Sequence, residues 1–319
     1  MVIPDVSGDR PDMVQQPRPA AHHRHVARWI ALAIAVIAAF AVVRAAGHFN
    51  QTFDEGAHVA SGIEWFQFHT YGYDPQHPPL GRIAIALGPW LSGVRGSHLH
   101  TSWEEGNRIL MDGNRYAHTL ALARLGVLPF FLLLLATVWV WTRWRYGETA
   151  ALLAVLLTAT VSPVLAQAGL ATTDMPLAGT LCFAWYAMLR WLERPGFRRT
   201  ALLALAFALA VTSKFSALPY FCLAALFVVV WRLVFGDRVC AGGNDAERVT
   251  RWRIANLGAF VVPAVLGLIG AGFVIWGVYR FHVSWARGGH IPIPAPELRA
   301  GLQQLVQHNT GGQAAYIFG

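Results

Sequence analysis

The sequence predicts an all-α fold: a polytopic transmembrane helical bundle whose long first outer loop carries interfacial helices. Of the 319 residues, 55% are hydrophobic and only 13% are charged, whereas a soluble domain carries about 25% charged residues. Apolar runs recur along the chain at about the 20-residue length that crosses the hydrocarbon layer of a bilayer. The three cysteines lie in or next to these runs without a CxxC spacing, so neither disulfides nor a cysteine-ligated metal is expected.

Seven apolar segments are the expected spans of a transmembrane catalytic module at 29–279. They are 29–46, 119–141, 149–168, 175–191, 200–212, 217–235 and 254–279. The polar, aperiodic segment 1–28 is predicted to be a disordered cytoplasmic tail, and its HHRH stretch is interpreted as part of that tail rather than as a metal site. The flanks of 29–46 are similar to a signal peptide, but the spans that follow favour an uncleaved first helix. The span at 200–212 is short and is expected to run into its successor through a break near Lys214.

The arginines predict the orientation of the bundle. The net charge is +8, from 24 arginines and one lysine against 17 acidic residues. With the N-terminus in the cytoplasm, most arginines between spans lie in inner segments, while the short outer turns near 169–174 and near Lys214 carry none. This clustering suits the inner face of a membrane better than a nucleic-acid groove. The same topology places five residues on the outer face, namely Asp54, Glu55, His77, Asp174 and Lys214.

The first outer loop, 47–118, is long and mixed in composition. Val59, Ile63 and Phe66 recur at helical spacing, which predicts a helix lying along the membrane interface. The apolar stretch 83–94 is too short to span and is interrupted by Gly88-Pro89, so we expect an interfacial or re-entrant segment. Segment 280–319 is predicted to begin a further outer loop, and we expect the chain to be the N-terminal portion of a longer protein.

Asp54 and Glu55 are adjacent carboxylates at the expected membrane–water interface. Such groups can accept a proton from an attacking hydroxyl or hold a divalent cation. On a regular helix they point about 100° apart, so they should play different roles. Helix capping by Thr52 or Asp54 is the alternative interpretation. Asp174 precedes Met175-Pro176 and is likewise a good N-cap.

Two cationic residues stand out on the same predicted face. Lys214 interrupts an apolar stretch, where it either extends its ammonium group to the interface or binds an anionic phosphate. The prolines of His77-Pro78-Pro79 fix the backbone direction and are followed by Arg82, whose guanidinium could bind a phosphate with two hydrogen bonds.

Together these motifs resemble the polytopic glycosyltransferases of the GT-C class. The similarity is to the protein O-mannosyltransferases and their bacterial relatives, including the aminoarabinose–lipid A transferases. It covers roughly 29–319 and rests on motifs in a fixed order: Asp54-Glu55, the HPPLGR stretch at 77–82, ATTDMPL at 171–177, SKF at 213–215, PIPAPELRAGL and GGQAAYIFG. Position 82 departs from the pattern, because protein O-mannosyltransferases usually carry lysine where this chain has arginine.

The resemblance implies transfer of a sugar, with a mannose-like hexose favoured, from a polyprenyl-phosphate donor to a hydroxyl or phosphate acceptor on the outer face of a bacterial-type plasma membrane. It implies inversion at the anomeric carbon, with Asp54 as general base and Glu55 supporting it or positioning the acceptor. Arg82 and Lys214 would contact the donor phosphate. The residues expected to shape the pocket or contact the acceptor are His77, Asp174 and His58. A divalent cation (Mg²⁺ or Mn²⁺) is not demanded, but Glu55 and His77 are the residues that could hold it.

Two rival functions are kept at this point. The first is the same chemistry on lipid A or another glycolipid instead of a protein. The second is a membrane transporter or lipid flippase, a class that often shows inverted repeats; we find no internal repeat in this sequence.

Overall fold

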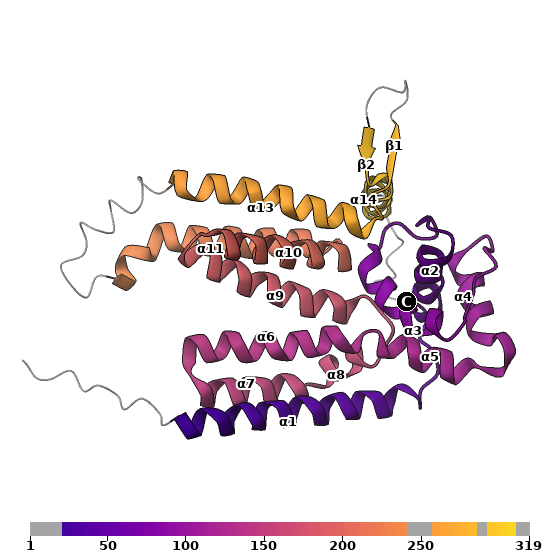
Figure 1. The fold of residues 1–319 in the computed structure, drawn as a ribbon, viewed down its shortest axis with the longest axis horizontal. Helices are drawn as coiled ribbons and strands as arrows, with labels where there is room; N and C mark the ends of the chain where they lie inside the picture. The colour runs from indigo at the N-terminus through magenta and orange to yellow at the C-terminus, as the bar shows by residue number, and fades with distance from the viewer. Residues whose placement is uncertain (1–20, 241–256, 286–291, 311–319) are drawn as a thin grey trace, which may run out of the picture.

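The computed structural model describes residues 21–240, 257–285 and 292–310, and these form a helical bundle with one short β-hairpin. In Figure 1 the long helices lie side by side, and the helices between α1 and α6 cover one end of them. The helices are α1 Ala21–Ala46, α2 Glu55–Gln67, α3 Pro79–Leu91, α4 Ser102–Met111, α5 Tyr116–Leu125, α6 Leu128–Tyr146, α7 Glu148–Thr160, α8 Ser162–Ala168, α9 Asp174–Glu193, α10 Phe197–Ser213, α11 Ala217–Cys240, α13 Leu257–Val278 and α14 Pro296–Thr310, with a 3-10 turn at Asp112–Asn114. Strands β1 Val283–Trp285 and β2 Pro292–Pro294 pair antiparallel.

The predicted all-α bundle is confirmed, and each expected span coincides with a helix or helix pair. Among the described residues, three helices are long and apolar enough to cross a membrane: His25–Ala46, Tyr116–Tyr146 and Val261–Val278. The pair α7–α8 adds a fourth if it is one span bent by 64°. Helices α9, α10 and α11 do not meet the same combination of length and hydropathy, so the expectation of seven spans stays a prediction.

The start of the first helix differs from the sequence-based expectation, whereas the break expected near Lys214 is present. Helix α1 already begins at Ala21, within the expected tail, because the polar residues before the apolar run continue its first turns. At this break α10 ends at Ser213, and the extended backbone of Lys214 separates it from α11. The predicted tail residues 1–20, the arginines at 248–253 and the glycine-rich stretch 311–319 lie outside the described residues.

Small side chains allow the bundle helices to pack closely. Alanines at 184, 187, 206 and 210 are fully buried between α9 and α10. Gly179 of α9 lies so close to α6 that an added Cβ would stand 2.3 Å from the carbonyl oxygen of Phe130. Close backbone approach of this kind drives helix association in membranes, where the hydrophobic effect is weak.

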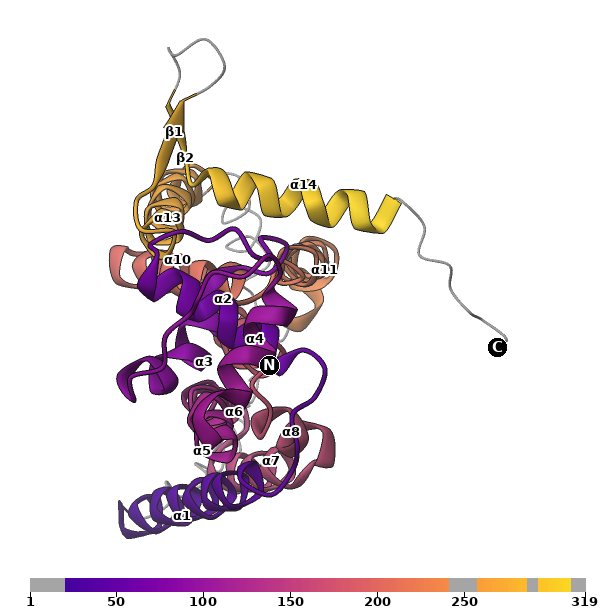
Figure 2. The same cartoon turned by 90° about the vertical axis from the view of Figure 1, so that its right-hand side faces the viewer.

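The segment predicted as the first outer loop folds as a compact cap of helices over one end of the bundle, seen face-on in Figure 2. The helix predicted around Val59 and Ile63 is present as α2, but it is not laid along a surface. Both side chains are fully buried in the main apolar core, because α3 and α4 cover the two sides of α2. At Gly62 of α2 an added Cβ would stand 2.2 Å from the carbonyl oxygen of Arg82, so only glycine lets α2 and α3 approach this closely.

The stretch 83–94 is also different from its prediction, because Gly88-Pro89 does not interrupt it. Helix α3 runs from Pro79 to Leu91 and contains Pro89. An added Cβ at Gly88 would stand 2.8 Å from the carbonyl oxygen of Leu122. The contact of α3 with α5 therefore holds the helix through residues that are unfavourable to it in isolation.

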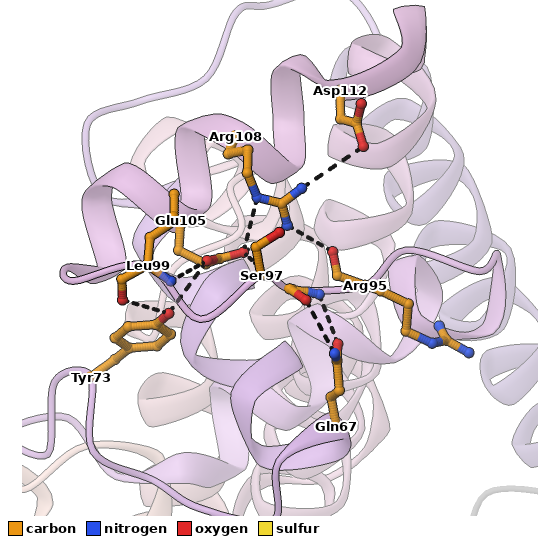
Figure 3. A network of polar contacts seen from close by, with 9 residues as sticks. Gln67, Tyr73, Arg95, Ser97, Leu99, Glu105, Arg108 and Asp112 are labelled. Carbon is orange, nitrogen blue, oxygen red and sulfur yellow. Dashed lines mark hydrogen bonds and ion pairs between the residues drawn. The ribbon is translucent and has the colours of Figure 1, made fainter.

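Buried carboxylates fix the turns of the cap. Glu105 of α4 accepts hydrogen bonds from the backbone N–H groups of Ser97 and Leu99, both at 2.8 Å, and from Arg108 at 2.7 Å, as Figure 3 shows. Glu64 of α2 accepts from the backbone N–H groups of Gly72 at 2.8 Å and Tyr73 at 3.1 Å. Each carboxylate thus satisfies the backbone donors of an irregular segment.

The most deeply buried ion pair joins the cap to the bundle. Arg124, at the end of α5, binds Glu55 with two hydrogen bonds, Nε to Oε1 and Nη2 to Oε2, both at 2.8 Å. Its remaining donors bind the carbonyls of Ala46, Phe49 and Asn50 at 2.6–2.9 Å. Both side chains are at most 1% exposed. The pair therefore fixes the chain just after α1 and the start of α2 to α5.

We expect Glu55→Gln to destabilise the protein by about 3–5 kcal/mol, because it leaves the Arg124 guanidinium buried without its counter-charge. Unfolding of the purified protein in detergent measures the loss. The control is Glu104→Gln, an exposed carboxylate on α4, which should unfold like the wild type. Wild-type stability of Glu55→Gln would contradict the structural role of this pair.

Candidate active site

Four segments that are distant in the sequence meet at the cap end of the bundle. The first residue of α2, Glu55, accepts a hydrogen bond from the backbone N–H of Ala171 at 2.8 Å. Gly81 of α3 packs against Pro176 of α9, 3.3 Å from an added Cβ. Lys214, between α10 and α11, pairs with Asp174 at the start of α9, Nζ to Oδ1 at 2.6 Å. The residues predicted for one site therefore do gather at one end; which side of a membrane this end faces stays a prediction.

Arg82 organises the centre of this cluster from α3. Its side chain is 1% exposed and forms an ion pair with Asp74. Its Nη1 donates to the Tyr71 hydroxyl at 3.2 Å and to the Asp74 carbonyl at 2.7 Å, and its Nε donates to Nδ1 of His58 at 3.0 Å. With these donors engaged, the predicted phosphate contact is not favoured by the geometry. The arginine at this position is explained, because its guanidinium serves four acceptor atoms spread around it, whereas a lysine ammonium is a single compact group with three donors.

Two histidine rings lie beside this guanidinium. His58 and His77 face each other edge to face, with ring centroids 5.6 Å apart. Burial, followed by the charges of Arg82 and Lys214, lowers the pKa of His58 well below its ordinary value. Burial and Arg82 likewise lower the pKa of His77 to about 4. Both rings are therefore neutral at neutral pH.

The ring of His77 has a nitrogen that is still available for a hydrogen bond, as far as the described residues are concerned. Its carbonyl oxygen accepts from the Tyr71 hydroxyl at 2.6 Å, which fixes the backbone at the start of the His-Pro-Pro corner. Its Nδ1 atom is buried and has no partner among the described residues. A buried polar atom without a partner is uncommon in folded proteins and is often found at functional sites.

The Asp174–Lys214 pair stands at the open side of the cluster. The side chain of Lys214 is 29% exposed and that of Asp174 is 46% exposed, so solvent or a ligand can reach both. Asp174 does not cap its helix: the N-cap residue of α9 is Thr173, without a side-chain cap bond. The aspartate instead holds the ammonium group in position, which excludes the purely capping interpretation.

Asp54 and Glu55 have opposite environments. Burial acts to raise the pKa of Glu55, but hydrogen bonds from Arg124, Ala171 and Thr52 together lower it, and these bonds occupy both of its oxygens. Asp54 is exposed and holds the N-cap position of α2 without a side-chain cap bond. Its carboxylate makes no hydrogen bond or ion pair with any residue that the structure describes. Of the two predicted catalytic carboxylates, only Asp54 is free to react.

A small hollow is formed in part by the residues that directly precede Asp54 in the chain. Its volume is about 280 Å³, and it is lined by Gln51, Thr52, Phe53, Trp103 and Asn107. The rings of Phe53 and Trp103 are 4.2 Å apart at their centroids, and Oε1 of Gln51 is buried without a partner in the described part of the chain. The hollow thus combines an aromatic wall with amide groups that can bind hydroxyls.

The predicted metal ligands Glu55 and His77 do not form a metal centre by themselves. Both Glu55 oxygens already accept two hydrogen bonds each. Within residues 21–240, 257–285 and 292–310, no group of three or more His, Cys, Asp or Glu side chains is placed to hold an ion.

Sequence reasoning missed Arg124, Asp74 and Tyr71, which position the site. Arg124 carried a usable signal, because an arginine inside an expected span is rare unless it is paired. Asp74 and Tyr71 carried none, because they are ordinary residues of a polar loop.

The described helices and their packing define an integral membrane protein of the polytopic helical class. Residues 32–269 match the family model of the dolichyl-phosphate-mannose-protein mannosyltransferases. The chain belongs to this family, which confirms the predicted membership of the GT-C class and excludes the transporter alternative. Family membership makes it a glycosyltransferase that depends on a prenyl-phosphate-linked mannose. No curated protein and no solved structure matches the chain.

The neutral histidines give the protein a defined pH dependence. The unfolded chain protonates both rings below pH 6.5, but folded His77 stays neutral down to about pH 4. Protonation therefore favours the unfolded state, and the free energy of unfolding falls as the pH is lowered through this window.

We expect His77→Asn to flatten this dependence by at most about 1.4 kcal/mol per pH unit, measured by unfolding between pH 7 and pH 4. His69→Asn is the control, because His69 is exposed and should leave the slope unchanged. An unchanged slope in His77→Asn would show that His77 is already charged in the folded protein.

Proposed function

We propose that this chain transfers mannose from a polyprenyl-phosphate carrier to a hydroxyl group of a protein, with inversion at the anomeric carbon and Asp54 as the general base. The observation that carries the proposal is that a free carboxylate, Asp54, and a partly exposed lysine, Lys214, lie at the same end of the bundle. A single displacement needs a base on the attacking hydroxyl and positive charge at the departing phosphate.

Asp54 is suited to the base because its carboxylate is exposed and unpaired within the described chain. It lies one helical turn before His58, whose backbone N–H donates to the Asp54 carbonyl at 3.1 Å. The hollow at Gln51, Phe53 and Trp103 beside it offers a place for the acceptor segment. Asp54 directly follows Phe53 of this lining, so an acceptor hydroxyl held there would lie close to its carboxylate.

Lys214 is suited to the donor phosphate because its ammonium is accessible and already positioned by Asp174. The neighbouring Arg82 guanidinium is paired with Asp74 and has its donors engaged, which leaves Lys214 as the accessible cation for the donor. The partial positive charge at the start of α9 acts in the same direction. The donor's lipid tail can remain in the bilayer while its phosphate binds at this end.

The other predicted site residues have positioning roles in this proposal. Arg82 holds His58, Tyr71 and Asp74, and Tyr71 in turn holds the backbone of His77. Glu55 positions Asp54 by fixing the start of α2 to Arg124. His77, with a free Nδ1, is the candidate for a hydrogen bond to a sugar hydroxyl. The predicted role of Glu55 as a ligand of a divalent cation is not favoured, because its oxygens are already engaged.

We expect Asp54→Asn to lower sugar transfer by about 10²–10⁴-fold, the usual contribution of a general base, with expression and membrane insertion unchanged. Transfer is measured in membranes supplied with polyprenyl-phosphate mannose. The control is Asp112→Asn, another exposed carboxylate of the cap. Wild-type turnover of Asp54→Asn would remove the base assignment.

We expect Lys214→Ala to weaken use of the lipid donor by about tenfold or more, since it removes a charge-assisted hydrogen bond to phosphate. Use of the acceptor should change less. The two KM values, measured separately, distinguish these effects, and Lys214→Arg should recover part of the loss. An equal effect on donor and acceptor would indicate a role in folding instead.

The acceptor is identified by offering the same membranes a labelled donor and separating protein from lipid products. Label in protein supports the proposal. Label in lipid A or another glycolipid would assign the alternative acceptor class and leave the chemistry intact.

A further inference from the structure

A large cavity lies at the other end of the bundle from the candidate active site. Its volume is about 800 Å³, and it is lined by α1, α6, α7 and α9. Helix α9 connects the two regions: Asp174 begins it at the active-site end, and Arg190 lines the cavity near its last residue, Glu193. A helix of this length measures about 30 Å. The cavity is therefore separate from the site that binds donor and acceptor.

The cavity has an apolar side and a basic side. Val26, Ile30, Val140 and Leu152 form the apolar wall, and Arg143 and Arg190 supply the positive charges. The side chains of Arg143 and Arg190 are 32% and 28% exposed, so a ligand can reach both. The surrounding helices α1 and α6 belong to membrane-length segments, so the apolar wall continues into the hydrocarbon layer.

The guanidinium groups of Arg143 and Arg190 are held in position, but the described residues do not engage all of their N–H donors. Arg143 donates from Nε to Glu148 at 3.0 Å, and its Nη groups have no partner within the described part of the chain. Arg190 stacks over the ring of Trp144, 4.6 Å from the ring centroid. Its Nε forms a long ion pair with Glu193 at 3.8 Å, and its Nη groups make no hydrogen bond with a described residue. Of the charged residues that line the cavity, two are arginines and one is Glu148, so the lining itself carries an excess of one positive charge, while Glu193 pairs with Arg190 from outside the lining.

From these features we infer that the cavity binds the headgroup of an anionic phospholipid, with the acyl chains along the apolar wall. The phosphate would accept hydrogen bonds from Arg143 and Arg190, which are the donor type best matched to phosphate oxygens. Basic pockets between membrane helices are suited to such headgroups. The cavity is far larger than an inorganic phosphate ion, and such an ion would make no favourable contact with its apolar wall. Trp144 and Tyr186, also in the lining, are residues typical of the interfacial layer where headgroups lie.

The test is native mass spectrometry of the full chain in detergent, titrated with phosphatidylglycerol. Phosphatidylcholine with the same acyl chains and inorganic phosphate are titrated in parallel. We expect phosphatidylglycerol to bind at least about tenfold more tightly than phosphatidylcholine, because the choline ammonium of phosphatidylcholine cancels the charge of its phosphate and is repelled by the two arginines. Equal binding of the two lipids, or displacement of phosphatidylglycerol by millimolar inorganic phosphate, would overturn the inference.

Variants assign the binding to this cavity. The double variant Arg143→Gln/Arg190→Gln should lose at least about tenfold in affinity for phosphatidylglycerol, whereas Arg143→Lys/Arg190→Lys should retain part of it. Arg198→Gln is the control, because Arg198 is an exposed arginine of α10 that does not line the cavity. Wild-type affinity in the double glutamine variant would overturn the inference. If that variant does not fold, the lysine variant and the comparison of lipids on the wild type decide.

Discussion

The buried pair of Glu55 and Arg124 is the constraint on which the arrangement of this molecule depends. Removing two charges from water is costly unless every donor and acceptor finds a partner. Here the guanidinium binds one carboxylate and three backbone carbonyls, and the carboxylate also accepts two backbone N–H groups. One pair thereby joins the end of α1, the start of α2, the end of α5 and the turn before α9. The two carboxylates at 54 and 55 divide their roles because only one of them can enter this pair.

Near the Glu55–Arg124 pair, the charge of Arg82 helps to keep His58 and His77 neutral. Arg82 lies between His58 and Asp74, and its charge adds to burial in disfavouring protonation of the rings. A neutral imidazole can both donate and accept hydrogen bonds, which suits it to sugar hydroxyls. The accessible positive charge is then left to Lys214, held at the rim by Asp174. Binding of phosphate and binding of sugar are thus supported by different groups.

The two ends of the bundle differ in the kind of charge they present. The cap end buries Arg82 and Arg124 in hydrogen-bond networks and leaves Lys214, Asp54 and Asp174 accessible. The opposite end keeps Arg143 and Arg190 accessible beside interfacial aromatic rings. This polarity agrees with the distribution of arginine that predicts a cytoplasmic N-terminus. Helices α9 and α10, packed through a core of alanines, connect the two ends.

The sequence by itself determined the class of fold, the approximate positions of the helices and several of the residues that gather at the candidate site. Hydrophobic runs and their flanking charges are local properties, so α1, α6, α9 and α13 could be placed without coordinates. Asp54, His77, Asp174 and Lys214 were identified by motif, and contacts across the chain link them at one end.

Only the tertiary structure decided which of these groups are free. Asp54 and Glu55 are chemically similar neighbours, and the buried partner of Glu55 lies 69 positions away. Arg82 could bind phosphate according to its sequence context, but Asp74 and Tyr71 occupy its donors. Likewise α3 runs through Gly88-Pro89 because α5 packs against it. In each case a contact between distant segments overrides a local preference, and no local pattern in one chain records such contacts.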